Sequence, residues 1–168
     1  MKKIIFLFIF SAFLLGCDTT ENDIPTVSIV GTWTGTAIDF TGTAQTEVQG
    51  IPVTANLVGE GDTLNFTYTL TENPNTATSE GSYNMEVTAS VLLQSQTEYR
   101  ENVPADFSGP WEQNGDTLTL TFEGEEVIAN IVELTETTLV LQFAITQTEE
   151  INGFEATVTL DMMISFSR

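Results

Sequence analysis

Hydrophobic and polar residues alternate along most of this 168-residue chain, from about residue 29 to its end. The clearest windows are 62–70, 116–122, 138–145 and 157–167. A period of two places successive side chains on opposite faces of a β-strand, and no apolar pattern with the helical period persists for three turns. Antiparallel sheet with one dry face and one solvated face produces this pattern. We therefore predict an all-β domain.

Turn signals divide this domain into strands. Asn114-Gly115 and Asn152-Gly153 are typical of two-residue hairpin loops, because both central positions of such a turn need positive φ. We predict eight to ten strands, at about residues 30–40, 44–58, 62–72, 79–94, 105–113, 116–123, 126–134, 137–149 and 153–167.

Two parts of this assignment are not regular strands. Gly50-Ile51-Pro52 must break or bulge the strand at 44–58, and 95–104 is predicted as a loop. A meander of this many strands must close or stack, because open edges invite aggregation. Strictly sequential hairpins favour an antiparallel up-and-down β-barrel, with a β-sandwich as the alternative.

The N-terminal segment has a different pattern. Two lysines precede an apolar run over residues 4–15, which ends at Gly16-Cys17. The run suits the apolar region of a signal peptide and is too short to span a bilayer. A small residue before a lone cysteine resembles the lipobox of bacterial lipoproteins.

That resemblance implies cleavage before Cys17, which would carry diacylglycerol and a further acyl chain such as palmitate. Three parts follow: a signal peptide at 1–16, a lipidated flexible tether at 17–28 and a barrel domain at 29–168. The acidic segment that begins at Asp18 resembles surface-export signals of lipoproteins of the Bacteroidetes type. We expect a lipid-anchored protein of the bacterial cell envelope, most of all the outer membrane, on its periplasmic face or at the cell surface.

Acidic residues greatly outnumber basic residues in this chain. The chain has 4 Lys and Arg residues, 24 Asp and Glu residues and no histidine. Two of the cations precede Cys17 and every acid follows it, so the mature chain would have a net charge of −22, with Arg100 and Arg168 as its cations. Nucleic acids and anionic lipid headgroups need a basic surface, which excludes them as partners.

The residue inventory argues against an enzyme. Without histidine, and with Cys17 assigned to lipid, the chain lacks the groups for Ser-His-Asp or Cys-His catalysis and for the usual zinc sites. No Gly-rich phosphate loop is present. The adjacent acids Glu125-Glu126 and Glu149-Glu150 are interpreted as solvated turns. We expect no catalytic residue, no metal and no cofactor.

Two short motifs suggest a family. Val30-Gly31-Thr32-Trp33 contains a Gly-x-Trp that resembles the first strand of lipocalin and other calycin barrels. In those barrels the tryptophan closes one end and a late arginine packs over it, which implies a closure by Trp33 and Arg168; simple core filling by Trp33 is the alternative. The stretch from Ser108 to Leu120 resembles the late hairpin of lipocalin-like domains in Bacteroidetes lipoproteins.

A barrel of eight or more strands can hold a small ligand. The side chains expected to line such a site are Leu64, Phe66, Tyr68, Leu118, Leu120, Phe122, Leu139, Leu141, Phe143 and Met162. They suit an apolar or amphipathic molecule, which the Tyr68 hydroxyl could orient. Alternatively these side chains fill the barrel, and the protein acts by contact with a protein partner that the sequence does not identify.

Overall fold

The computed structural model describes residues 27–122, 124–151 and 154–168. The predicted signal peptide, Cys17, almost all of the tether and the turn at Asn152-Gly153 lie outside the described residues. In the described part, no helix has the length and apolar character needed to cross a membrane. The strands are β1 (Gly31–Val48), β2 (Ile51–Thr71), β3 (Thr76–Val91), β4 (Gln94–Pro104), β5 (Gly109–Asn114), β6 (Thr117–Phe122), β7 (Glu125–Leu134), β8 (Thr138–Ile151) and β9 (Phe154–Ser167).

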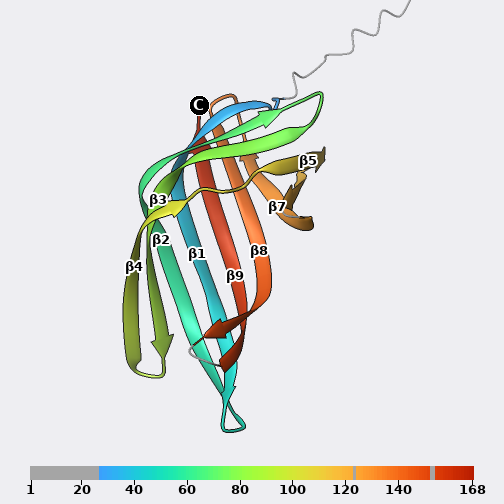
Figure 1. Cartoon of the computed structure of the whole chain (residues 1–168). Helices are drawn as coiled ribbons and strands as arrows, with labels where there is room; N and C mark the ends of the chain where they lie inside the picture. Colours follow the sequence, from blue (N-terminus) through green and yellow to red (C-terminus); the bar gives the residue numbers. More distant parts are fainter. Residues whose placement is uncertain (1–26, 123, 152–153) are drawn as a thin grey trace, which may run out of the picture.

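All nine strands belong to one antiparallel sheet. Their order is β2-β1-β9-β8-β7-β6-β5-β3-β4, and β2 also pairs with β3. Eight strands therefore close into a ring, and β4 adds to β3 outside it (Figure 1). This confirms the predicted up-and-down barrel, and the alternative of a β-sandwich is not adopted.

The first two strands are longer than predicted. The expected break around Pro52 is instead the turn of the β1–β2 hairpin, where Gln49 and Gly50 have φ of 55° and 78° and Val48 pairs with Ile51. The glycines at 59 and 61 do not end a strand. A Cβ at Gly59 would lie 2.1 Å from the Phe40 ring, so glycine makes room for a core side chain there.

The Gly-Asp-Thr-Leu sequence occurs twice and serves two purposes. At 61–64 the β2–β3 register shifts between Asp62 and Asn65, and Thr63 has φ of 49°, which marks a β-bulge within a continuous strand. At 115–118 the first two residues, Gly115 and Asp116, form the two-residue turn of the β5–β6 hairpin, one residue later than the predicted loop at Asn114-Gly115.

The prediction of a loop at 95–104 is wrong, because this segment is β4, paired with residues 82–91 of β3. Every side chain of β4 except Val103 is exposed, so the strand has no dry face and leaves no alternating pattern. The start of the strand predicted at 105–113 is also wrong, since β5 begins at Gly109.

The ring is closed along only part of its height. The β7–β8 pairing ends at Ala129 and Phe143, beyond which β8 continues to Ile151 paired with β9 alone. On the other side, β3 pairs with β5 only at Thr76 and Ala77. We call the end that holds the C-terminus the upper end and the end that holds the β1–β2 turn the lower end (Figure 1). Below the closed part, the sheet consists of the neighbouring strands β8, β9, β1, β2, β3 and β4. It is curved and remains open on one side.

The densest packing lies in the closed upper part. Trp33, Leu70, Leu118 and Leu139 are each 0% exposed. The Phe166 ring packs parallel to Tyr68 and edge-on to Phe66, with centroid distances of 5.9 Å in both pairs. Toward the lower end the inward positions of β2 are only half-buried, as at Val53, Ala55 and Leu57.

Candidate ligand-binding site

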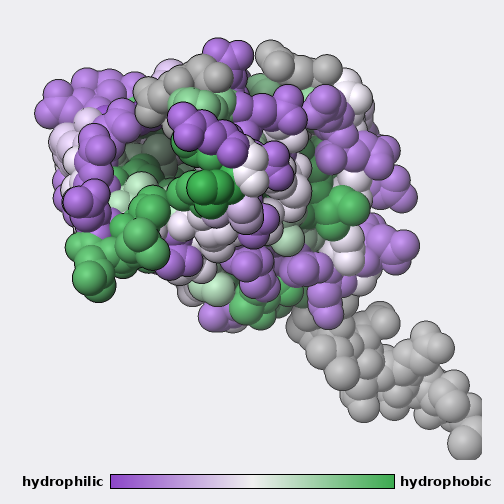
Figure 2. Space-filling view, turned by 90° about the horizontal axis from the view of Figure 1, so that it is seen from below, coloured by the Kyte–Doolittle hydropathy of each residue, from purple (hydrophilic) through white to green (hydrophobic). Residues whose placement is uncertain are grey.

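A cavity of about 710 Å³ lies where β7 separates from β8. Its walls are the segment leading into β5, the β6–β7 hairpin and the middle of β8, and β9 contributes Met162 and Ile164. The volume falls within the range of about 300 to 1,000 Å³ that small-molecule sites occupy. Seen from below, the molecule is hollowed and hydrophobic side chains are visible within the hollow (Figure 2).

The period of two explains why the cavity is largely apolar. Inward positions on neighbouring strands bring together Leu120, Phe122, Val127, Phe143, Ile145, Met162 and Ile164. The polar residues that line the cavity include Thr121, Thr146 and Gln147, and its ionisable residues, among those that the structure describes, are Glu125 and Glu126. None of the described Lys or Arg residues lines it. The cavity therefore offers an apolar interior with an acidic margin.

One wall is held in place by Ser79 of β3. The Ser79 hydroxyl donates to the carbonyl oxygen of Ala105 and accepts a hydrogen bond from the Phe107 amide at 2.7 Å. The Ala105 amide donates to the carbonyl of Gly81 at 3.1 Å. These bonds fix the segment between β4 and β5, so that Phe107 forms part of the cavity wall although 39% of it remains exposed.

The side chains expected to line a ligand site divide into two groups. Leu120, Phe122, Phe143 and Met162 line the cavity. The others pack in the closed core: Phe66, Tyr68, Leu118, Leu139 and Leu141 are buried, and Leu64 is partly buried against them. Sequence reasoning missed Phe107, Val127 and Ile145. Phe107 lies outside regular structure, and the apolar pair Val127-Ile128 obscures which of the two points inward.

Tyr68 does not reach the cavity. It is 3% exposed and packs in the upper core, and among the described residues its hydroxyl has no hydrogen-bond partner. Burial raises the pKa of Tyr68, because the phenolate would lose its solvation. The hydroxyl is thus a buried polar group in the core rather than a group that orients a ligand in the cavity.

Trp33 and Arg168 meet at the upper end. The guanidinium carbon of Arg168 lies 4.1 Å from the centre of the Trp33 ring, within the range of a cation–π contact. The indole N–H of Trp33 donates to the carbonyl of Ile29 at 2.8 Å. Trp33 is fully buried and belongs to the core cluster, so it fills the core beneath Arg168.

Arg168 also holds three chain segments together. Its Nη1 and Nη2 donate to the carbonyls of Val30 and Ser28 at 3.0 and 3.2 Å, and its Nε donates to the carbonyl of Glu136 at 2.6 Å. The start of β1, the turn between β7 and β8 and the C-terminus therefore share one contact. Ligand entry through this end would have to displace it.

Trp111 has a structural place in the β5–β6 hairpin. It is 7% exposed, belongs to the core cluster and donates its indole N–H to the carbonyl of Thr71 at 3.0 Å. It does not line the cavity.

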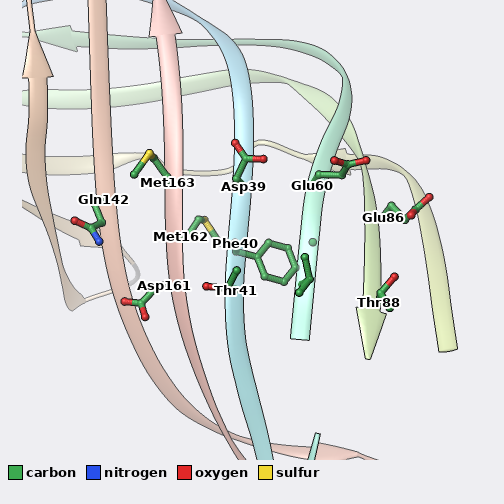
Figure 3. Close-up of a pocket in the computed structure, with 12 residues that line it drawn as sticks. Asp39, Phe40, Thr41, Glu60, Glu86, Thr88, Gln142, Asp161, Met162 and Met163 are labelled. Atoms are coloured by element: carbon green, nitrogen blue, oxygen red, sulfur yellow. The ribbon is translucent and has the colours of Figure 1, made fainter. Parts of the chain in front are cut away.

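A second hollow, of about 450 Å³, lies across β1, β2, β3, β8 and β9, and we call it the acidic groove. Asp39 pairs directly with Glu60, and Glu60 with Glu86, so three carboxylates form a row across adjacent strands (Figure 3). The described part of the chain places no basic residue along the groove. Within the described ranges, no group of three or more His, Cys, Asp or Glu residues is arranged to hold a metal ion. The apolar cavity is therefore the better candidate for a binding site.

Comparison with known proteins agrees with the closed ring of antiparallel strands. A search of curated proteins and a search of solved structures each found no match. A family model described as a lipocalin-like domain matches residues 29–141. The match covers more than half of the chain and includes β1 to β7, and on this basis the chain belongs to the lipocalin-like domain family.

Proposed function

We propose that the protein binds a small apolar or amphipathic ligand inside its barrel. The observation that carries this proposal is the cavity of about 710 Å³, whose walls are mostly aliphatic and aromatic. Burial of apolar ligand surface against such walls is favourable by about 25 cal/mol per Å². A barrel filled to its lower end, with function limited to surface contacts, would leave no such space.

Binding is tested with a fluorescent apolar probe whose emission rises when it leaves water. We expect the purified protein to take up the probe saturably. Ile145→Trp places a larger side chain on the cavity wall and should weaken uptake at least about ten-fold. The matched control is Val132→Trp on β7, where the native side chain is 54% exposed and does not line the cavity.

If Ile145→Trp and Val132→Trp bind the probe equally, the probe does not occupy the cavity. If neither these variants nor the native protein bind it, the proposal fails, and a role in contact with a protein partner becomes the better explanation. Folding of each variant is checked by its thermal unfolding transition.

We further propose that the protein is a lipoprotein anchored through Cys17. The support is the sequence: two lysines, an apolar run and Gly16-Cys17 in the order of a lipobox. Cys17→Ser should abolish incorporation of labelled palmitate and move the protein from the membrane fraction to the soluble fraction. Unchanged labelling of Cys17→Ser would contradict this anchor.

We propose the outer membrane as the site of anchoring, in a bacterium of the Bacteroidetes type. The acidic segment that begins at Asp18 supports this, since it resembles surface-export signals. Protease added to intact cells should degrade a surface-exposed barrel and spare one that faces the periplasm. Recovery of the lipidated protein in the inner-membrane fraction would contradict the proposal.

A further inference from the structure

We infer that the cavity selects amphiphiles with a cationic head group and discriminates against carboxylates such as fatty acids. This inference rests on the proposed binding function and adds the charge of the ligand to it. It depends on which ionisable side chains lie on the cavity wall, on where the cations of the described chain are engaged, and on the field of the whole domain.

The two carboxylates on the wall come from the start of β7. Glu125 pairs with Phe122 and Glu126 with Thr121, and all four residues line the cavity. Both acids are exposed, so they stand at the margin between the apolar interior and water. Glu125 shares a face of the sheet with Phe122, so an amphiphile whose chain enters beside Phe122 and Val127 would place its head group near the Glu125 carboxylate. Glu126 lies on the other face with Thr121 and adds a second negative charge at the same end of β7.

The cations of the described chain are engaged elsewhere. Arg168 lies over Trp33 at the upper end and binds three backbone carbonyls. Arg100 is on β4, where its Nε lies 3.0 Å from a carboxylate oxygen of Glu98. Neither lines the cavity. A ligand carboxylate at the margin would face the like charge of Glu125, with Glu126 nearby and no basic partner, whereas an ammonium would face opposite charges.

The negative charge of the rest of the chain also favours a cationic ligand over an anionic one. Acids outnumber Lys and Arg by 24 to 4 in the whole chain, and the acidic groove adds a row of carboxylates on the outer face. Such a field raises the local concentration of cations and lowers that of anions, more so at low ionic strength. Apolar contact would supply most of the affinity, and charge would supply the selection.

The test uses dodecylamine, dodecanol and dodecanoate, which share one alkyl chain and differ in head-group charge. Each competes at neutral pH and low salt with the fluorescent probe bound to the purified protein. We expect the amine to displace the probe at about ten-fold lower concentration than the carboxylate, with the alcohol between them. The difference should shrink in high salt, because the carboxylates are exposed.

Variants assign the effect to the cavity margin. Glu125→Gln with Glu126→Gln should weaken dodecylamine binding about five-fold and leave dodecanol unchanged, because each exposed ion pair contributes little and two act together. The matched control replaces another adjacent pair, Glu149→Gln with Glu150→Gln, on the part of β8 beyond the cavity walls. It removes the same net charge at a different place.

The outcomes separate this inference from the binding function. If the three compounds displace the probe equally, or if dodecanoate is preferred, the inference fails and ligand binding stands. If the Glu149/Glu150 control weakens amine binding as much as the Glu125/Glu126 variant, the cavity margin does not select charge. If no compound displaces the probe, the binding proposal fails first.

Discussion

The upper and lower parts of the barrel are built from the same strands but are packed in different ways. In the upper part, side chains from opposite walls meet, and Trp33 lies buried beneath Arg168. In the lower part, β7 has left β8 and β5 is short, so inward side chains of β8 and β9 face a cavity. The same alternation therefore yields a packed core where the ring closes and a binding surface where it opens.

The largest expected difference between the two parts is the cost of removing an aromatic side chain. Trp33→Ala removes a fully buried ring from a packed region and should lower the free energy of unfolding by about 3 to 5 kcal/mol. Phe122→Ala removes a half-buried ring beside an existing cavity and should cost only about 1 kcal/mol. Urea denaturation of both variants measures the comparison. Equal losses would show that the lower part is packed as tightly as the upper part.

The next prediction concerns the contact between Arg168 and Trp33 at the upper end. Arg168→Ala removes a cation–π contact and three hydrogen bonds to carbonyls, and we expect a loss of about 1 to 2 kcal/mol in the free energy of unfolding. Arg168→Lys keeps the charge but not the planar fork, so it should fall between alanine and the native residue. If Arg168→Lys unfolds at the same temperature as the native protein, the positive charge alone accounts for the stabilisation by Arg168.

The next prediction concerns the buried hydroxyl of Tyr68, which should destabilise the upper core. This hydroxyl is buried and lacks a partner among the described residues, so Tyr68→Phe should raise the free energy of unfolding by about 1 kcal/mol. In the folded state burial raises the pKa of Tyr68 above its ordinary value of about 10. The unfolded chain therefore releases this proton first, and the native protein loses stability as the pH rises above about 10.

In Tyr68→Phe this alkaline loss should be smaller but not absent, because burial also raises the pKa of the half-buried Tyr83. Denaturation curves collected between neutral and alkaline pH measure how the free energy of unfolding falls with pH in the variant and in the native protein. Parallel curves for the variant and the native protein would contradict the assignment to Tyr68.

The smallest effect is expected at the acidic groove, on the outer face between the two parts. Glu60→Lys replaces a carboxylate directly opposite Asp39 and Glu86 and should stabilise the protein by about 0.5 kcal/mol. Glu112→Lys makes the same change opposite Thr119 and serves as the control. Thermal unfolding at low salt should separate the two variants, and added salt should reduce the gap. A gap that salt does not reduce would argue against charge repulsion.

The strands that could be predicted from sequence are those with one dry face and one solvated face. Residues 116–122 and 138–145 alternate because β6 and β8 face the interior on one side only. β4 escaped prediction because it adds to the edge of the sheet and has no dry face. The predicted strands 44–58 and 62–72 leave a gap at the glycines 59 and 61, but β2 continues through it, because glycine can also admit a large side chain such as Phe40 within a strand.

The candidate site could be predicted only in part, for a related reason. Alternation tells whether a side chain points inward, but it does not tell at what height along the barrel it lies. Phe66 and Phe143 both point inward, yet Phe66 packs in the closed core and Phe143 also reaches the cavity. The height depends on where β7 separates from β8, which follows from pairings between residues distant in sequence.

The Arg168 contact also bears on how the barrel would respond to force. A pull on the N-terminus enters the domain beside Ser28 and Val30, which Arg168 joins to the opposite end of the chain. Tension then runs along β1, whose flanks are hydrogen-bonded to β2 and β9 over most of its length. Such ladders are loaded in shear, so many hydrogen bonds share the tension instead of opening one after another. A barrel tethered at this end would resist extraction better than one held by the turn of a single hairpin.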